Sequence, residues 1–447
     1  MPGRQLLAKL IGATSGAEPH ETKAALLAFL CNFVLLASYY VLRPMRDTMA
    51  TVFGVAALQN LFTGTFVLTL LCAPLFAWAA ARVRLERLLP GVFWFLLSNL
   101  LIFYFLFRAA PQDRWLAAAF FWWFSVINLF LVSIFWTLMA DVFSSGQATR
   151  LFAFIAAGGS AGAIAGPLLT AGFVRSVGVA GMLLVAGAGF LLVILLVHLL
   201  MREKARLRAA SPRAQKTTLD HPLPGHPLRG FALLFKSPFL LNQAAFMLLM
   251  TWIATLFYFL QTDIVAKTFS GMENRAIAFA DVDLFVNAAT AAILILGLGR
   301  SLQRFGVTPC LMLTPLLMGL ACLGIAMAPS FLLIQAARSA QRISQYAIAR
   351  PSREVLFTVM DQQSKYKAKN VIDTAVYRFG DLTAAWLQAG LRGAGLGLVG
   401  VMGFGMAVSA AWGVVAWALG HRYETLRRHD QTAAAQAEPP WPLRSRP

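Results

Sequence analysis

Three stretches of this chain place charged side chains inside otherwise apolar sequence. The first holds Arg43, Pro44, Arg46 and Asp47. Pro44 removes a helical hydrogen bond, which is tolerated where a helix faces protein or a cavity. Arg46 is therefore a candidate for binding an anionic substrate, and Asp47 a candidate for gating. The alternative is that both residues mark the end of a helix and reach water.

The second stretch, 331–360, is long and polar. As a helix it gathers its polar side chains within an arc of about 100°. Arginines cannot face lipid, so this arc must meet water, acids or a ligand, and its arginines lack the three-residue spacing of a voltage sensor. Arg338, Arg342 and Tyr346 are candidate anion-binding residues, and Pro351 should break the helix. The arc contains Gln335, Arg338, Arg342, Gln345, Tyr346 and Arg353.

The third stretch, 369–391, carries acids on one helical face of about 80°. Asp373 or Asp381 could pair with Arg338 or Arg342, or could carry a coupling proton. Structural ion pairs that hold the helices in register are an equal alternative. The face contains Asn370, Asp373, Tyr377, Asp381 and Gln388, with Arg378 beside it; Asp281, Asp283 and Asn287 are further candidates of this kind in 279–298.

The composition indicates that these stretches lie in a membrane. The chain is 59% hydrophobic and 13% charged, against about 45–50% and about 25% in soluble proteins. Its four cysteines lie in apolar segments without metal-ligand spacing, which predicts neither disulfides nor a metal, and no cofactor is expected. The formal charge of +19 comes from bases between apolar blocks. These bases indicate membrane topology and contact with anionic lipid, and nucleic acid is not an expected partner.

Apolar blocks of about 20 residues match the thickness of a bilayer. Twelve such blocks predict an all-α integral membrane protein in two six-helix halves. The blocks lie near 24–50, 58–80, 88–107, 115–140, 151–173, 179–200, 239–261, 279–298, 309–327, 331–360, 369–391 and 396–419.

The predicted organisation follows from these blocks. Roughly 25 of the 38 Lys and Arg residues fall in segments on one side, which places both termini in the cytosol of an inner-membrane protein. No outer loop is long enough for a receptor or catalytic domain. The predicted parts are a cytosolic segment 1–23, a half 24–200, a basic linker 201–238, a half 239–419 and a disordered tail 420–447.

The two halves also resemble each other. Short basic loops, 81–87 and 299–306, occupy the same place in each half, as expected for parallel repeats. This arrangement resembles major facilitator transporters, although Gln303 stands where their loop motif has Asp. The run Gly162–Pro167 resembles a signature of antiporters in that superfamily; close helix packing is the simpler explanation of its glycines.

Enzyme signatures are absent from the sequence. It has no phosphate-binding Gly-x-x-x-x-Gly-Lys loop and no His-Glu-x-x-His motif. A membrane enzyme acting on a lipid-linked substrate would need acids or histidines near one face and a sizeable outer loop. A sensor or scaffold would leave the central charges unexplained. A transporter without enzymatic activity is the better interpretation.

Two segments resemble one transporter family more specifically. Ser352–Phe357 with Ser364–Thr374, and the run Leu42–Asp47, are similar to the ATP/ADP translocases. The resemblance implies that Arg46 occupies a phosphate-contacting position, and that the solute is a nucleotide such as ATP or ADP, exchanged by alternating access.

Two departures from that family weaken the nucleotide assignment. Gly380-Asp381 stands where the translocases have Gly-Lys, and helix four offers Asn128 but no glutamate. An anion in place of a cation disfavours a tetra-anionic solute. We therefore expect a secondary transporter of a small anionic solute, either a nucleotide or another phosphate-bearing metabolite. A proton-coupled transporter of a non-nucleotide solute remains open, as do exchange against symport and the oligomeric state.

Overall fold

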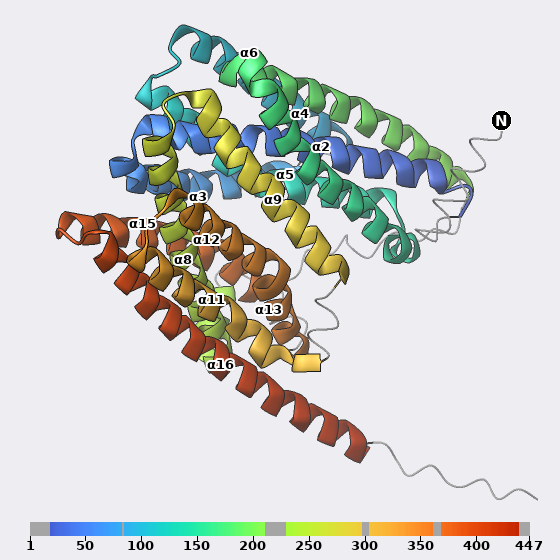
Figure 1. Cartoon of the computed structure of the whole chain (residues 1–447). Coiled ribbons are helices and arrows are strands. Elements are labelled where there is room, and N and C mark those ends of the chain that lie inside the picture. Colours follow the sequence, from blue (N-terminus) through green and yellow to red (C-terminus); the bar gives the residue numbers. More distant parts are fainter. Residues whose placement is uncertain (1–17, 83–84, 211–228, 297–303, 361–367, 438–447) are drawn as a thin grey trace, which may run out of the picture. The chain divides into compact units, whose positions relative to one another are not determined.

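The computed structural model describes residues 18–82, 85–210, 229–296, 304–360 and 368–437. Within these ranges the chain is helical and has no β-strand, which confirms the predicted all-α fold (Figure 1). The elements are α2 (Thr22–Phe53), η1 (Val55–Ala57), α3 (Leu58–Arg82), α4 (Leu85–Ala109), α5 (Arg114–Val142), α6 (Ser145–Ala210), α7 (Arg229–Lys236), α8 (Pro238–Thr268), α9 (Met272–Leu296), α11 (Val307–Met327), α12 (Phe331–Ser344), η3 (Gln345–Ala349), α13 (Arg350–Leu356), η4 (Phe357–Val359), η5 (Ile372–Val376), α15 (Tyr377–Gly393) and α16 (Leu398–Ala437).

Parts of the predicted segments lie outside the described residues. These parts are 1–17 of the N-terminal segment, 83–84 of the first basic loop, 211–228 of the linker, most of the second basic loop (299–303), 364–367 of the translocase-like segment and 438–447 of the tail. Residues 420–437, for which the sequence predicted disorder, continue α16 as a helix. Their Ala, Gln, Glu and Arg residues are good helix formers.

Nine helices in the described residues are long and apolar enough to cross a membrane. One of them, α6, contains two of the predicted spans joined at Gly178. The segments 331–359 and 368–393 are helical but are not among the nine, because they carry the charged residues. The helices thus overlap the twelve predicted spans, with different ends in places, and the two most polar helices are among those that carry candidate functional residues.

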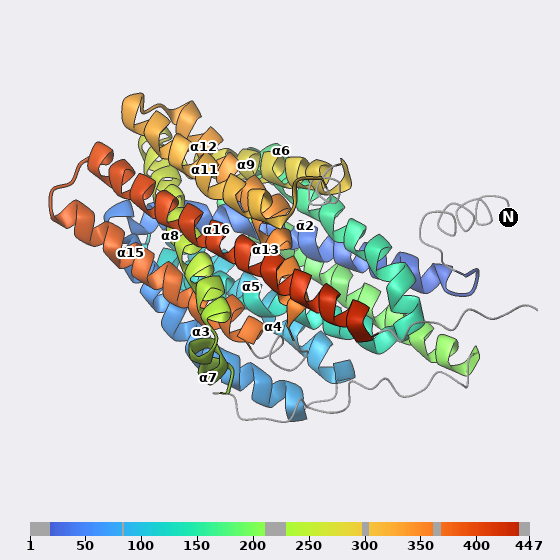
Figure 2. The same ribbon diagram turned by 90° about the horizontal axis from the view of Figure 1, so that it is seen from below.

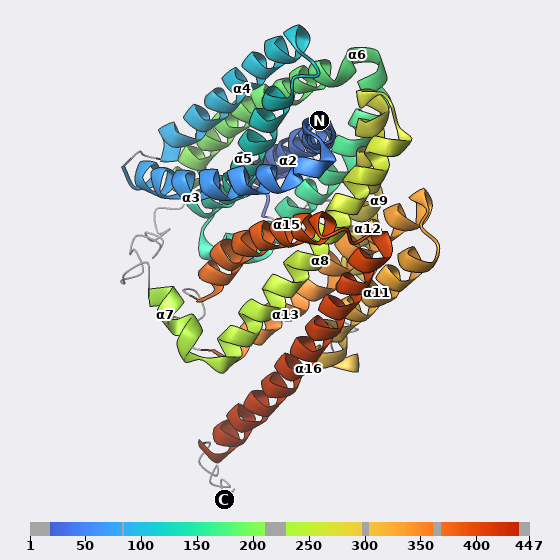
Figure 3. The same cartoon turned by 90° about the vertical axis from the view of Figure 1, so that its left-hand side faces the viewer.

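The contacts divide the chain into two units. Unit 1 comprises residues 1–224 and 259–289, and its apolar core is built mainly from α2, α4, α5 and α6 (Figure 1). Unit 2 comprises residues 225–258 and 290–447. In unit 2, α11 packs along α16, and α8 contacts α15 and α16 (Figures 2 and 3). The segment 259–289 falls in the predicted second half but contacts the helices of the first.

Helix α2 is the centre of unit 1 because both arms of α6 pack against it. Along the first arm, Gly158 and Gly166 approach the carbonyls of Phe29 and Ala37, so this arm runs parallel to α2. The second arm runs antiparallel to α2, and its contacts with α2 end at the ion pair between Glu203 and Lys23. The chain reverses at Gly178, whose φ of +73° is accessible mainly to glycine.

The glycines of α6 pack directly on the α2 backbone. A methyl group built at Gly162 would lie 2.2 Å from the Phe33 carbonyl oxygen. Small residues at four-residue spacing allow helices in a membrane to approach this closely. Packing therefore accounts for the run Gly162–Pro167 without reference to antiport.

Replacing Gly162 with Ala should destabilise unit 1 by on the order of 1–3 kcal/mol, because the rigid Phe33 carbonyl cannot yield to the added methyl group. The matched control is Gly172→Ala on the same helix, where a methyl group would meet nothing within 4 Å. Thermal unfolding of the purified protein in detergent measures both. Equal unfolding midpoints for the two variants would contradict the packing assignment.

Candidate functional site

Arg338 and Arg342 are buried on α12. The Arg338 guanidinium donates to the Ala254 carbonyl oxygen of α8 at 3.0 Å and to Gln341 Oε1 at 2.5 Å. It also lies over the Tyr258 ring, 5.6 Å from the centroid. These partners are neutral oxygens and an aromatic face, and they orient the guanidinium.

The predicted break at Pro351 takes a different form in the structure. The helix continues past Pro351, and the residues just before it, Gln345–Ala349, form a π-helical turn. Proline cannot donate to the carbonyl four residues earlier and clashes with it, and a wider turn relieves that conflict. A second π-helical turn, Ile372–Val376, lies in the neighbouring polar helix and contains Asp373. Such turns are frequent at functional sites.

Asp373 forms an ion pair with Arg353, not with the arginines of α12. Asp373 Oδ1 lies 2.5 Å from Arg353 Nη2, and the two side chains are 32% and 4% exposed. Glu354 lies 3.6 Å from the same guanidinium and also contacts Lys369. These contacts join α13 to the π-helical turn of the next helix.

Asp381 lies on α15, and its carboxylate contacts α8. One carboxylate oxygen is 3.5 Å from Arg378 Nη1, and the other accepts a hydrogen bond of 3.4 Å from Thr255. Tyr377, one turn before Asp381, interacts electrostatically with Asp381 and with Arg350. Arg350 lies over the Tyr346 ring, 4.9 Å from its centroid. Two arginines, two tyrosines and one acid, all half-buried, thus come from the two polar helical segments 331–359 and 368–393: Tyr346, Arg350, Tyr377, Arg378 and Asp381.

In unit 1, Arg46 and Asp47 form an ion pair at 2.5 Å on α2. They do not mark the end of the helix, because α2 continues to Phe53 and Asp47 is buried. The Arg46 guanidinium also lies over the rings of Phe121 and Phe124 on α5. Asn128 is half-buried one turn beyond Phe124, close to the same face of α5.

Asp283 lies on α9, where its carboxylate is 3.7 Å from Arg43 of α2. Asn287, one turn further along α9, donates to the Ala163 carbonyl oxygen of α6 at 2.7 Å. Near the start of α9, Arg275 donates to Thr51 Oγ1 at 3.1 Å. The first half of α9 is therefore held to unit 1 by polar contacts along its length.

The family to which this chain belongs follows from a match between its sequence and the Major Facilitator Superfamily over residues 28–275, more than half of the chain. The chain belongs to the major facilitator superfamily. It is accordingly a multi-pass membrane protein and a secondary transporter rather than an enzyme. A search of curated protein sequences finds no match.

Solved structures share the fold of this major facilitator protein. The nucleoside transporter NupG superposes with a TM-score of 0.63 at 14% identity, covering 89% of this chain and 98% of NupG. A bacterial homologue of the lysosomal transporter Spinster gives 0.55 at 16% identity, with 92% and 98% covered. The POT family transporter PepTSo gives 0.62 at 11% identity, with 90% and 98% covered. At these identities the likeness establishes the fold alone.

Sequence patterns missed several residues of this transporter that the structure brings into polar contact. Arg275 was missed because α9 was predicted to begin at 279, whereas it begins at Met272. The signal was present, since Gly271 precedes an acid, Glu273, in the first turn. Thr255 lies in an apolar run and gave no signal, and Arg350 lies outside the predicted polar arc of 331–360.

The Arg353–Asp373 pair yields a prediction about stability. Asp373→Asn leaves a buried guanidinium without its nearest anion, which costs about 3–5 kcal/mol for a fully buried pair. Because Asp373 is partly exposed and Glu354 remains nearby, we expect the free energy of unfolding to fall by on the order of 1–3 kcal/mol.

The matched control is Lys369→Gln. The Lys369–Glu354 pair has the same 2.5 Å separation, but its side chains are 33% and 44% exposed, so its removal should cost about 0–1 kcal/mol. Denaturation in detergent compares the two variants. A larger loss of unfolding free energy in Lys369→Gln than in Asp373→Asn would refute the role of burial.

Proposed function

We propose that this transporter moves a small anionic solute, either a nucleotide or another phosphate-bearing metabolite, by alternating access. Arg338, Arg342 and Tyr346 bind the solute in unit 2, and Arg46 and Asn128 contribute in unit 1. Asp47, Asp373, Arg378 and Asp381 act in gating or coupling. The proposed location is the inner membrane, with both termini in the cytosol and lipid as the surrounding partner.

The observation that carries the proposal is how charged residues are distributed among the membrane helices of unit 2. Residues 238–258, 307–327 and 398–420 contain no charged side chain. All charges of the spans fall on 331–359 and 368–393, which hold seven bases and three acids. Charges in a bilayer are costly unless they are paired or hydrated. An anionic solute would add negative charge beside this excess of bases.

The geometry of the arginines fits phosphate. A guanidinium presents its N–H donors in a planar fork that can bind two phosphate oxygens at once. Arg338 is oriented by the neutral oxygens of Ala254 and Gln341, and Gln341 donates in turn to Gln345. This chain of hydrogen bonds positions the guanidinium before the solute arrives and lowers the entropic cost of binding.

Tyr346 and Tyr377 add aromatic surface beside these charges. A solute with a planar ring and a phosphate would use both features. The division into halves 24–200 and 239–419 is likewise part of the proposal, with the segment 259–289 associated with the first half.

The position of Asp381 supports the second candidate function. Its carboxylate neutralises part of the charge of Arg378 and would repel a tetra-anionic nucleotide. A smaller anion carried together with protons would tolerate Asp381 better, and Asp381 is placed to exchange a proton. Nucleotide exchange would therefore be favoured by removing the negative charge of Asp381, whereas proton-coupled transport of a smaller anion would require this carboxylate.

Uptake of radiolabelled ATP and ADP into proteoliposomes, with and without internal nucleotide, tests the proposal. Arg338→Ala, Arg342→Ala and Arg46→Ala should each lower uptake at least about tenfold, since a hydrogen bond to a charged group contributes about 1.5–3 kcal/mol. Arg392→Ala, at the far end of α15, is the matched control and should retain transport.

If folded protein takes up no nucleotide under any gradient, nucleotides are excluded, and smaller phosphate-bearing anions with an imposed pH gradient become the next substrates to test. If uptake of every anion is equal in wild type and in the three arginine variants, anion binding by these residues is refuted.

Asp381→Asn separates the two candidate functions. If nucleotides are the solute, removing the negative charge should lower the apparent KM for ATP several-fold, because the repulsion is lost. If protons are coupled at Asp381, the same variant should still exchange solute at equal pH but should fail to concentrate it under a pH gradient. Measuring exchange and gradient-driven uptake on one preparation distinguishes these outcomes.

A further inference from the structure

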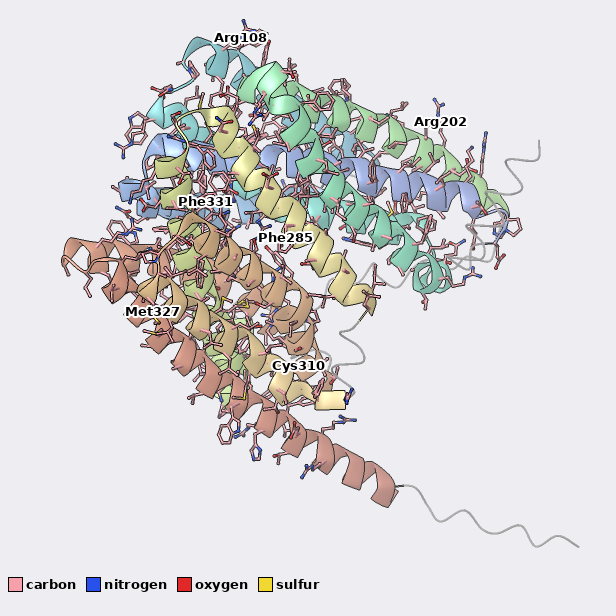
Figure 4. The ribbon with its side chains drawn as sticks, viewed as in Figure 1. Arg108, Arg202, Phe285, Cys310, Met327 and Phe331 are labelled. Atoms are coloured by element: carbon pink, nitrogen blue, oxygen red, sulfur yellow. The ribbon has the colours of Figure 1, made fainter. Side chains whose placement is uncertain are left out.

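Two glutamines of unit 2 are buried and have no role in the proposed anion site. Gln335 lies on α12, one turn after Phe331, which is labelled in Figure 4, and is 8% exposed. Gln388 lies on α15 and is 4% exposed. Within the part of the chain that the structure describes, Gln335 Oε1 and both amide atoms of Gln388 have no hydrogen-bond partner. Because burying an amide without a hydrogen bond is unfavourable, these atoms indicate a partner that the described residues do not provide.

Each glutamine shares a helical face with residues of the anion site. Gln335 precedes Arg338 by one turn and Arg342 by two turns, so the three side chains lie within about 60° around α12. Gln388 follows Asp381 by two turns and lies within about 20° of it around α15. The two glutamines therefore continue the polar faces of their helices.

Contacts with α8 show the direction in which α12 extends from the site. Arg353 contacts Met247, whereas Arg338 lies over the Tyr258 ring. Residue numbers thus rise along 331–356 as they fall along α8, and the two segments are antiparallel. Gln335 is displaced from Arg338 in the direction that leads from Met247 towards Tyr258.

The second polar segment extends in the same direction. Asp373 pairs with Arg353, which contacts the earlier part of α8, and Asp381 accepts a hydrogen bond from Thr255 further along α8. This segment is therefore parallel to α8. Since Gln388 follows Asp381, both glutamines lie on the same side of the charged residues.

We propose that Gln335 and Gln388 form a neutral subsite that binds hydroxyl groups of a sugar ring carried by the anionic solute. An amide oxygen only accepts hydrogen bonds, and an amide nitrogen only donates them. A hydroxyl group does both, so a ring with several hydroxyls can satisfy both amides. A ketone or an aldehyde would offer no donor to Gln335 Oε1, and an ammonium group would be repelled by the nearby arginines.

The spacing of these residues excludes inorganic phosphate as the complete solute. Along the axis of α12, Gln335 lies about 4.5 Å from Arg338 and about 10 Å from Arg342. A phosphate ester of a sugar reaches both the arginines and the amide, and sugar phosphates and nucleotides share this chemistry. Placement of the phosphate at the arginines rests on the proposed function, whereas binding of hydroxyls by the glutamines does not.

Equilibrium binding of four radiolabelled probes to the full chain in lipid nanodiscs tests the inference. The probes are inorganic phosphate, ribose 5-phosphate, ADP and adenosine. Wild type should bind ribose 5-phosphate at least several-fold more tightly than phosphate. Gln335→Met and Gln388→Met keep the length of the side chain without its polar atoms. Each should weaken the three ribose-containing probes about two- to tenfold, as for one neutral hydrogen bond, and leave phosphate binding unchanged.

Gln243→Met is the matched control. Gln243 of α8 is 0% exposed, and its two amide atoms likewise have no partner among the described residues. It lies about 16 Å before Ala254 along the helix, away from the subsite. A merely structural role would let all three Met variants change the thermal unfolding midpoint without changing the preference for ribose 5-phosphate over phosphate. That result, or an equal loss of preference in Gln243→Met, overturns the inference.

Further arms separate this inference from the proposed function. Arg338→Ala should weaken phosphate, ribose 5-phosphate and ADP but not adenosine. If wild type binds adenosine but no anion, and the glutamine variants lose adenosine, the subsite stands and the anionic solute is refuted.

Other outcomes decide against the subsite. If the glutamine variants weaken ADP and adenosine but not ribose 5-phosphate, the amides bind the base, and the hydroxyl assignment is overturned. If folded wild type binds none of the four probes, both proposals are overturned. Gln388→Asn, which withdraws the amide by one methylene group, should weaken the same probes and replaces Gln388→Met if that variant does not fold.

Discussion

A charged group within a bilayer must be paired or hydrated, and this constraint organises the polar interior of the protein. Unit 1 meets it with pairs on α2: Arg46 with Asp47, and Arg43 with Asp283. Unit 2 has pairs of the same kind, Arg353 with Asp373 and Arg378 with Asp381, although its two polar spans hold more bases than acids. This excess of positive charge is the reason for proposing an anionic solute.

The two polar helices are also irregular. A regular α-helix satisfies its own backbone and offers a ligand only side chains. Two π-helical turns, Gln345–Ala349 and Ile372–Val376, interrupt these helices beside Arg350 and Asp373. A wide turn loosens the backbone hydrogen bonding and is a place where a helix can change its winding. The Arg353–Asp373 pair links the second turn to α13, so winding in one helix constrains the other.

Apolar length and charge spacing were enough to predict the helices and the two polar faces, because both follow from local sequence and from bilayer thickness. Pairing partners were not predictable in this way. Asp373 has several arginines within reach on the neighbouring helix, and the sequence favoured Arg338 or Arg342, whereas the structure selects Arg353. That selection depends on the relative height and rotation of two helices, which the π-helical turns alter. The contact between Arg43 and Asp283 joins residues 240 positions apart, and nothing local encodes it.

Helix α8 contributes residues to both units. Its Ala254 carbonyl and Tyr258 ring hold Arg338, and its Thr255 contacts Asp381. From Phe259 onward the same helix belongs to unit 1. No break separates these segments, because α8 is continuous from Pro238 to Thr268. The boundary between the units therefore falls between two aromatic residues of one helix, Tyr258 and Phe259, where the sequence gives no signal for it.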